Sequence, residues 1–200
     1  MKRTSPFSYC GALLVIGLLI FAGGCVTTTQ PILLDNQVVA DNTFIGKWAT
    51  DDARNKVAIT AGADEKTYAL VYTDDKEKKG SFTARFGKID TLLVMKLSPA
   101  DPAPDASDVY KAQLLPLYSF YILDKKTPDQ ISLRVMKSEW LKKYNSDHPG
   151  ELAMMTGSPD RMIVTAATAD FQAFLKKHVG DEGVFGDPAI FNRVAEAPAK

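Results

Sequence analysis

The chain has 200 residues, enough for one domain with additional terminal segments. Its composition is 46% hydrophobic and 24% charged, which is ordinary for a folded protein with a real core. The formal net charge is zero. The chain therefore lacks the basic surface of a nucleic-acid-binding protein and any polybasic patch for anionic lipid, and we expect no nucleic-acid partner.

The first 24 residues have the pattern of an export signal. Lys2 and Arg3 form a short positive region, and an apolar run from 12 to 22 follows it. Small residues then precede Cys25, as they do at a signal-peptidase cleavage site. Removal of residues 1–24 leaves 22 basic residues against 24 acidic ones. It also removes Cys10, one of the two cysteines.

The residues Ala22, Gly23, Gly24 and Cys25 resemble the lipobox of bacterial lipoproteins, although Ala22 stands where leucine is usual. The resemblance implies that the three small residues are recognised by the signal peptidase and that the Cys25 thiol carries the lipid. We expect no other cofactor. Because Cys25 is consumed and Cys10 discarded, the mature domain would have no disulfide and no cysteine-based metal site.

The lipoprotein resemblance also predicts where the protein lies. Val26, rather than aspartate, follows the cysteine, which favours an outer membrane facing the periplasm if the host is Gram-negative. The alternative is an uncleaved anchor from Phe7 to Val26, a stretch of 20 residues that is nearly enough to span a bilayer. This stretch contains Ser8, Tyr9 and four glycines, which weaken it as a spanning helix. In both cases the domain lies outside the cytoplasm and is tethered to a membrane.

Beyond the signal, we predict three segments. Residues 25–41 would be the lipidated cysteine and a flexible tether, because the polar run from 26 to 31 has no periodicity. Residues 42–186 would form one globular β-rich domain. Residues 187–200 would be a poorly ordered tail.

Strands are predicted from alternating apolar residues along most of the domain. The alternation is seen in residues 44–48, 57–59, 68–72, 82–86 and 131–135, and short apolar runs cover 91–97 and 162–164. The charged segment 74–80 ends in glycine, as longer hairpin loops often do. Residues 98–107 form a proline-rich loop, and a long strand with a break at Pro116 is predicted over 110–123.

Two helices are predicted near the C-terminus, with Ser138 and Thr168 as their capping residues. Apolar residues after Thr168 have the spacing of an amphipathic helix, which ends at Gly180. The predicted fold class is mainly β (α+β): an antiparallel curved sheet or barrel of about seven strands with two C-terminal helices.

The Gly46-Lys47-Trp48 sequence near the start of the domain resembles the Gly-x-Trp signature of lipocalins. The resemblance implies that Gly46 and Trp48 belong to the closed end of an eight-stranded barrel, with an arginine stacked on the tryptophan. Three residues could supply that cation: Arg134, Arg161 and Arg193. The alternative is that Trp48 is simply a core aromatic residue.

A second resemblance covers residues 114–194, which contain the sequences SEWLKK and RMIVTAATADFQAFLKKHVGDEGVF. They are similar to a recurrent bacterial domain of uncharacterised function. This implies a self-contained domain and says nothing about its activity.

No catalytic or metal-binding set is predicted. His148 and His178 are the only histidines, and thirty residues separate them. There is no Gly-x-Ser-x-Gly elbow and no phosphate-binding loop. Aromatic residues cluster at Tyr118, Phe120 and Tyr121, where they belong to a core or line a pocket.

Three functions follow as hypotheses. The first is a lipid-anchored binding or accessory module of the cell envelope that holds a small apolar ligand or contacts an envelope protein. The second is a structural or assembly lipoprotein without a pocket. The third is a hydrolase of envelope material, for which no residue stands out.

Overall fold

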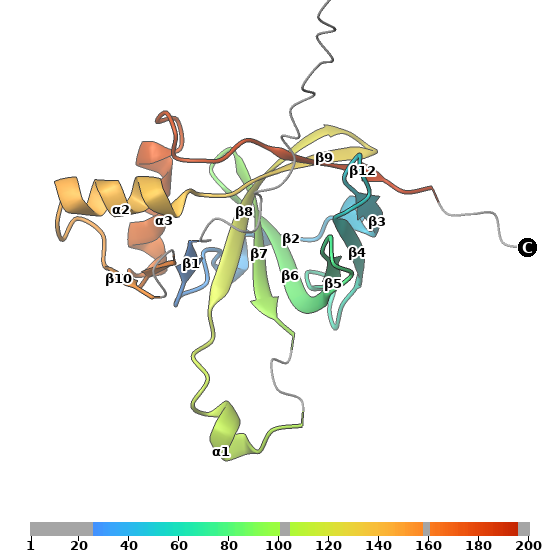
Figure 1. The fold of residues 1–200 in the computed structure, drawn as a ribbon, viewed down its shortest axis with the longest axis horizontal. Helices are drawn as coiled ribbons and strands as arrows, with labels where there is room; N and C mark the ends of the chain where they lie inside the picture. The colour runs from blue at the N-terminus through green and yellow to red at the C-terminus, as the bar shows by residue number, and fades with distance from the viewer. Residues whose placement is uncertain (1–25, 101–104, 158–160, 196–200) are drawn as a thin grey trace, which may run out of the picture.

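The computed structural model describes residues 26–100, 105–157 and 161–195 (Figure 1). The proposed signal segment, with Ala22, Gly23, Gly24 and Cys25, lies outside these residues.

Most of the described chain is β-structure. The strands are β1 (Thr27–Thr28), β2 (Val38–Val39), β3 (Gly46–Ala49), β4 (Lys56–Ala61), β5 (Tyr68–Thr73), β6 (Lys79–Ile89), β7 (Leu92–Pro99), β8 (Tyr118–Thr127), β9 (Gln130–Arg134), β10 (Met154–Thr156), β11 (Met162–Val164) and β12 (Ala189–Arg193). The helices are α1 (Asp108–Lys111), α2 (Ser138–Asp147) and α3 (Thr168–His178), with short 3-10 helices η1 (Asp35–Gln37) and η2 (Asn42–Phe44).

Eight antiparallel strands close into a barrel. Their order is β8-β7-β6-β5-β4-β3-β12-β9, and β9 pairs back to β8 to complete the ring. This confirms the predicted fold class and decides between its two forms, because no open edge remains in the ring. Strand β12 is the eighth strand of this ring, and the sequence pattern did not predict it.

The two faces of the barrel wall support two separate cores. Alternate residues of β8 point inward, as Tyr121 and Leu123 do, or outward, as Phe120 and Ile122 do. The inward set packs with Phe44, Trp48 and other residues in the barrel interior. The outward set packs beneath α2 and α3, which lie together beside the barrel (Figure 1).

The segment from Val26 to Val38 contributes four residues to the outer core, so the prediction of a flexible tether is wrong for this part of the chain. Strand β1 pairs with β8 and with β11, and Val26 and Thr28 are buried. Ile32 and Leu33 are buried as well. The polar threonines hid this packing, because a two-residue strand has too few positions to show alternation.

Gln172 of α3 ties this segment to the domain. Its side-chain amide donates to the Ile32 carbonyl at 2.6 Å and to the Gln37 side chain at 2.7 Å. Gln172 is buried, so its removal leaves the Ile32 carbonyl without this partner.

We predict that Gln172→Ala lowers the free energy of unfolding by about 1–3 kcal/mol, the cost of an unsatisfied buried polar group plus lost packing. Urea titration followed by circular dichroism measures the change. Thr60→Ala is the control, because Thr60 is exposed on the outside of β4. A Gln172→Ala variant as stable as this control would show that the N-terminal segment is not held by α3.

The C-terminal segment also differs from its prediction. Residues 187–200 were expected to be a poorly ordered tail, but β12 within them pairs with both β9 and β3. Ala189 and Phe191 are buried. The strand was missed because five residues directly after a proline carry little periodic signal, while their pairing depends on distant strands.

Two local predictions are corrected in the same way. The long strand over 110–123 is instead helix α1 followed by an irregular stretch, and β8 begins only at Tyr118, beyond Pro116. Ser138 and Thr168 are the first helical residues rather than the caps, and their hydroxyls do not cap either helix. The Thr168 hydroxyl donates instead to the Pro31 carbonyl at 2.8 Å.

Candidate functional site

One end of the barrel is closed around Trp48. This side chain is 1% exposed, and its indole N–H donates to the Phe44 carbonyl at 2.9 Å. Of the three arginines considered above, Arg193 lies over the indole, with its guanidinium 4.1 Å from the ring centroid. Arg193 also donates to the carbonyls of Ile45 and Thr43, at 2.8 and 2.7 Å. The pair thus links strands β3 and β12 to the segment that crosses the barrel end.

Gly46 is required at this end for two reasons. Its φ angle is +142°, which residues other than glycine rarely adopt. A Cβ atom at this position would lie 2.4 Å from the Arg193 guanidinium. The Gly-x-Trp pattern therefore has a local physical basis in this chain: the glycine leaves room for the cation that covers the tryptophan.

Phe44, at the end of η2, forms the floor of the interior. Its ring stacks on Phe86 with centroids 4.2 Å apart, and Tyr68 packs edge-on against Phe86 at 5.1 Å. The Tyr68 hydroxyl accepts a hydrogen bond from the Asp41 backbone N–H at 2.7 Å. These contacts hold η2 across this end of the barrel.

A cavity of about 1090 Å³ begins above this floor and extends through the open end of the barrel to residues outside it, such as Leu114 and Arg161. This volume slightly exceeds the range of about 300–1,000 Å³ that is typical of small-molecule sites. Most of the lining residues are aliphatic or aromatic. They include Phe44, Val57, Ile59, Leu70, Tyr72, Phe82, Phe86, Met95, Leu97, Tyr121, Leu123, Ile131, Leu133 and Phe191.

The residues at the floor of the cavity are tightly packed. Phe44, Phe86 and Phe191 are at most 1% exposed, so little open space adjoins them. Val57 and Phe82 also line the cavity but are only partly buried. The accessible space therefore lies toward the other end of the barrel, where β5 and β7 end and β6 and β8 begin.

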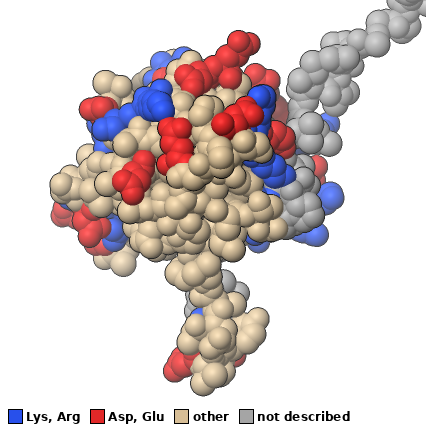
Figure 2. Space-filling view, turned by 90° about the vertical axis from the view of Figure 1, so that its left-hand side faces the viewer, with Lys and Arg blue, Asp and Glu red and all other residues tan. Residues whose placement is uncertain are grey.

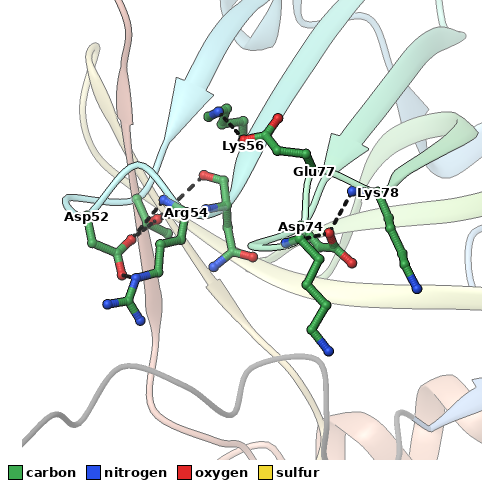
Figure 3. A network of polar contacts seen from close by, with 9 residues as sticks. Asp52, Arg54, Lys56, Asp74, Glu77 and Lys78 are labelled. Atoms are coloured by element: carbon green, nitrogen blue, oxygen red, sulfur yellow. Dashed lines mark hydrogen bonds and ion pairs between the residues drawn. The ribbon is translucent and has the colours of Figure 1, made fainter.

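The rim of this open end carries charged turns (Figure 3). Lys56 pairs with Glu77 across neighbouring hairpins at 2.8 Å. In the first turn the Asp52 carboxylate accepts from Thr50 and from the Arg54 backbone, and these bonds lower the pKa of Asp52. In the second turn Asp74 accepts from the backbone of Lys78 at 2.8 Å. These local bonds stabilise the turns and leave the charges in solvent.

Tyr72 is the polar residue that joins this rim to the cavity. Its hydroxyl donates to the Asn55 side chain at 2.5 Å. Burial, followed by the nearby carboxylates of Asp74 and Asp75, raises the pKa of Tyr72 to about 12. The phenol therefore stays neutral at physiological pH and adds no charge to the cavity wall.

The connection between β7 and β8 extends the mouth outward. It contains α1 and protrudes below the barrel in Figure 1. Leu114, Leu115 and Leu117 of this connection line the outer part of the cavity. The lining also includes two cations, Lys111 and Arg161, which lie outside the ring of barrel strands.

The histidines have a packing role. His178 is buried, and its Nδ1 lies 2.6 Å from the Asp181 carboxylate. His178 packs edge-on against Tyr144 at 4.8 Å, and His148 stacks on Tyr144 at 4.4 Å. Tyr144 packs against the outer core, whereas His148 is exposed just after α2, and neither histidine lines the cavity.

Within residues 26–100, 105–157 and 161–195 no group of three or more histidine, cysteine, aspartate or glutamate side chains could hold a metal ion. None of the described helices is both long enough and apolar enough to cross a membrane. Comparisons with family models, with curated proteins and with solved structures find no match for this chain.

Proposed function

We propose that this chain is a lipid-anchored binding protein of the cell envelope whose barrel holds an elongated apolar ligand, such as a fatty acyl chain. The observation that carries this proposal is the 1090 Å³ cavity, closed at one end by Trp48 and Arg193 and accessible at the other. An apolar ligand gains free energy by leaving water for such a wall, at roughly 0.8 kcal/mol per methylene.

The charges around the cavity support a ligand with a polar or anionic head. No aspartate, glutamate or histidine is found among the described residues that line it. Among the described lining residues the cations are Lys111 and Arg161, and both lie outside the barrel strands. A tail inside the barrel would thus leave its head beside these cations. The absence of acidic groups from the described lining gives the hydrolase hypothesis no support there.

The lipobox-like residues around Cys25 support anchoring of the domain to a membrane, with the outer membrane preferred. The second candidate function is a structural or assembly lipoprotein. The observation in its favour is the group of exposed apolar side chains on the β7–β8 connection. The two functions differ in whether the barrel carries a ligand.

Ligand binding is tested by native mass spectrometry of the full chain released from membranes. We predict a retained molecule of lipid mass in the native protein. Val57→Trp places a large side chain in the cavity, and a mismatch of about 1.4 kcal/mol would reduce the bound fraction of a subsaturating ligand about tenfold. Fluorescent fatty acid titration provides the same comparison in solution.

Thr60→Trp is the matched control, because Thr60 lies on the same strand, exposed on the outside of the barrel. This variant should bind ligand as the native chain does. Equal binding by both variants, or no bound molecule and no fatty acid uptake by the native chain, would refute the binding function in favour of the structural one.

A further inference from the structure

The connection between β7 and β8 carries an unusual concentration of exposed apolar side chains. Val109, Tyr110, Leu114 and Leu115 are all exposed, Val109 by 77% and Leu115 by 63%. The other exposed large apolar residues in the described chain, Leu34, Met155 and Val194, are scattered. Single exposed apolar residues are normal on a soluble surface, whereas a contiguous group marks an interaction site.

These side chains have no core to join. Helix α1 contains no buried residue. The protrusion extends away from the barrel, and its surface is mostly uncharged in Figure 2. Within residues 105–117 the charged groups are Asp105, Asp108 and Lys111, a net charge of −1. The loop therefore has no net positive charge to attract anionic headgroups, and its exposed apolar side chains favour an apolar partner.

The apolar surface of this connection is continuous with the cavity. Leu114 and Leu115 are exposed and also belong to the cavity lining. An acyl chain that moves between a bilayer and the barrel along this path would remain in contact with apolar side chains. The exposed apolar residues of the connection therefore lie at the entrance of the cavity and do not form an isolated surface patch.

The N-terminal strand β1 meets β8 close to the connection. Thr28 pairs with Tyr118, the first residue of β8 after the connection. Since β1 runs antiparallel to β8, the chain from Thr28 back to Val26 leads away from the connection, and membrane insertion depends on the loop itself.

We propose that residues 105–117 form a membrane-insertion loop, and that Val109, Tyr110, Leu114 and Leu115 enter the interface of a zwitterionic lipid bilayer. The barrel mouth then faces the bilayer, and its ligand is drawn from the membrane. This inference rests on the proposed function for its ligand and its anchor, but the insertion itself can be measured separately.

The test uses full-length chain reconstituted into phosphatidylcholine vesicles, with or without bromine on the acyl chains, which quenches nearby tryptophan. Leu115→Trp places a reporter on the loop. Val194→Trp is the matched control, because Val194 is 44% exposed just beyond β12, at the closed end of the barrel. The native chain provides the common background of Trp48 and Trp140.

We expect the Leu115→Trp variant to be quenched at least about twofold more than the Val194→Trp variant, because interfacial side chains lie about 5–10 Å deep. Equal quenching of the two reporters would overturn the proposal and leave a protein partner as the reason for the exposed patch. Adding Val109→Asp to the Leu115→Trp variant should reduce its quenching without changing the circular dichroism spectrum, and unchanged quenching would also contradict insertion.

The same vesicles separate this inference from the proposed function. The Val57→Trp change, combined with a reporter at residue 115, should leave loop quenching intact while fatty acid binding falls. Strong loop quenching in a chain that never binds fatty acid would refute the binding function and retain the insertion loop. Fatty acid binding without loop quenching would refute the insertion loop and retain the binding function.

Discussion

The Trp48→Ala variant is expected to lose about 3–5 kcal/mol of unfolding free energy, the range for removing a large aromatic residue from a core. Trp48 is fully enclosed, bonds to the Phe44 carbonyl and lies under Arg193. Its loss opens a cavity and removes the support of η2. Because the net stability of a domain is about 5–15 kcal/mol, this change consumes much of it. Urea titration followed by circular dichroism measures the loss.

Two further variants make the Trp48 result specific. Val194→Ala changes an exposed neighbour of Arg193 and should alter stability by no more than about 0.5 kcal/mol. Arg193→Met, alone and combined with Trp48→Ala, gives the coupling between the two side chains. A coupling of about 0.5–2 kcal/mol is expected for a cation over an indole. Additive effects would mean that the stacking contributes nothing and that Trp48 acts only by filling space.

The second large effect concerns the lipid. Cys25→Ser is expected to abolish incorporation of radiolabelled palmitate and to leave the precursor uncleaved, because a serine hydroxyl does not replace the thiol that receives diacylglycerol. Stable anchoring needs at least two lipid chains, so the variant should also lose the permanent lipid tether. Labelling of cells that express the full chain, followed by intact mass, measures both effects.

Cys10→Ser is the control for this experiment. Cys10 lies within the proposed signal and should be dispensable, so lipidation and cleavage should proceed as in the native chain. Palmitate on the Cys25→Ser variant, or a native protein that retains residue 1, would contradict the lipoprotein proposal. The uncleaved anchor from Phe7 to Val26 would then replace it.

Local patterns in the sequence were sufficient to predict the class of fold. Inward and outward residues alternate along β4, β5, β6 and β9, and such alternation is a property of the strand itself. The amphipathic spacing in α3 predicted a helix, because its apolar stripe must be covered whatever it packs against. The Gly-x-Trp pattern indicated the neighbourhood of the closed barrel end, although it could not say which arginine lies there.

The remaining features depended on contacts between residues far apart in the chain. Arg193 lies over Trp48 only because β12 pairs between β9 and β3, and the segment that contains it looked like a tail. Similarly, Val26 is buried only because β1 pairs with β8 and β11. Segments of two to five residues have too little periodicity to reveal their partners, and pairing with strands far away in the chain decides their structure.

The cavity and the exposed loop also could not be predicted from the sequence. The aromatic residues on β8 belong to both faces of the wall, and only ring closure separates Tyr121, which lines the cavity, from Phe120, which lies under the helices. The apolar residues from Tyr110 onward predicted a strand, because composition does not distinguish a buried apolar segment from a solvent-exposed one. The sequence by itself therefore determined which segments are amphipathic, whereas the tertiary structure decided what each apolar face covers and which faces remain open for a ligand or a membrane.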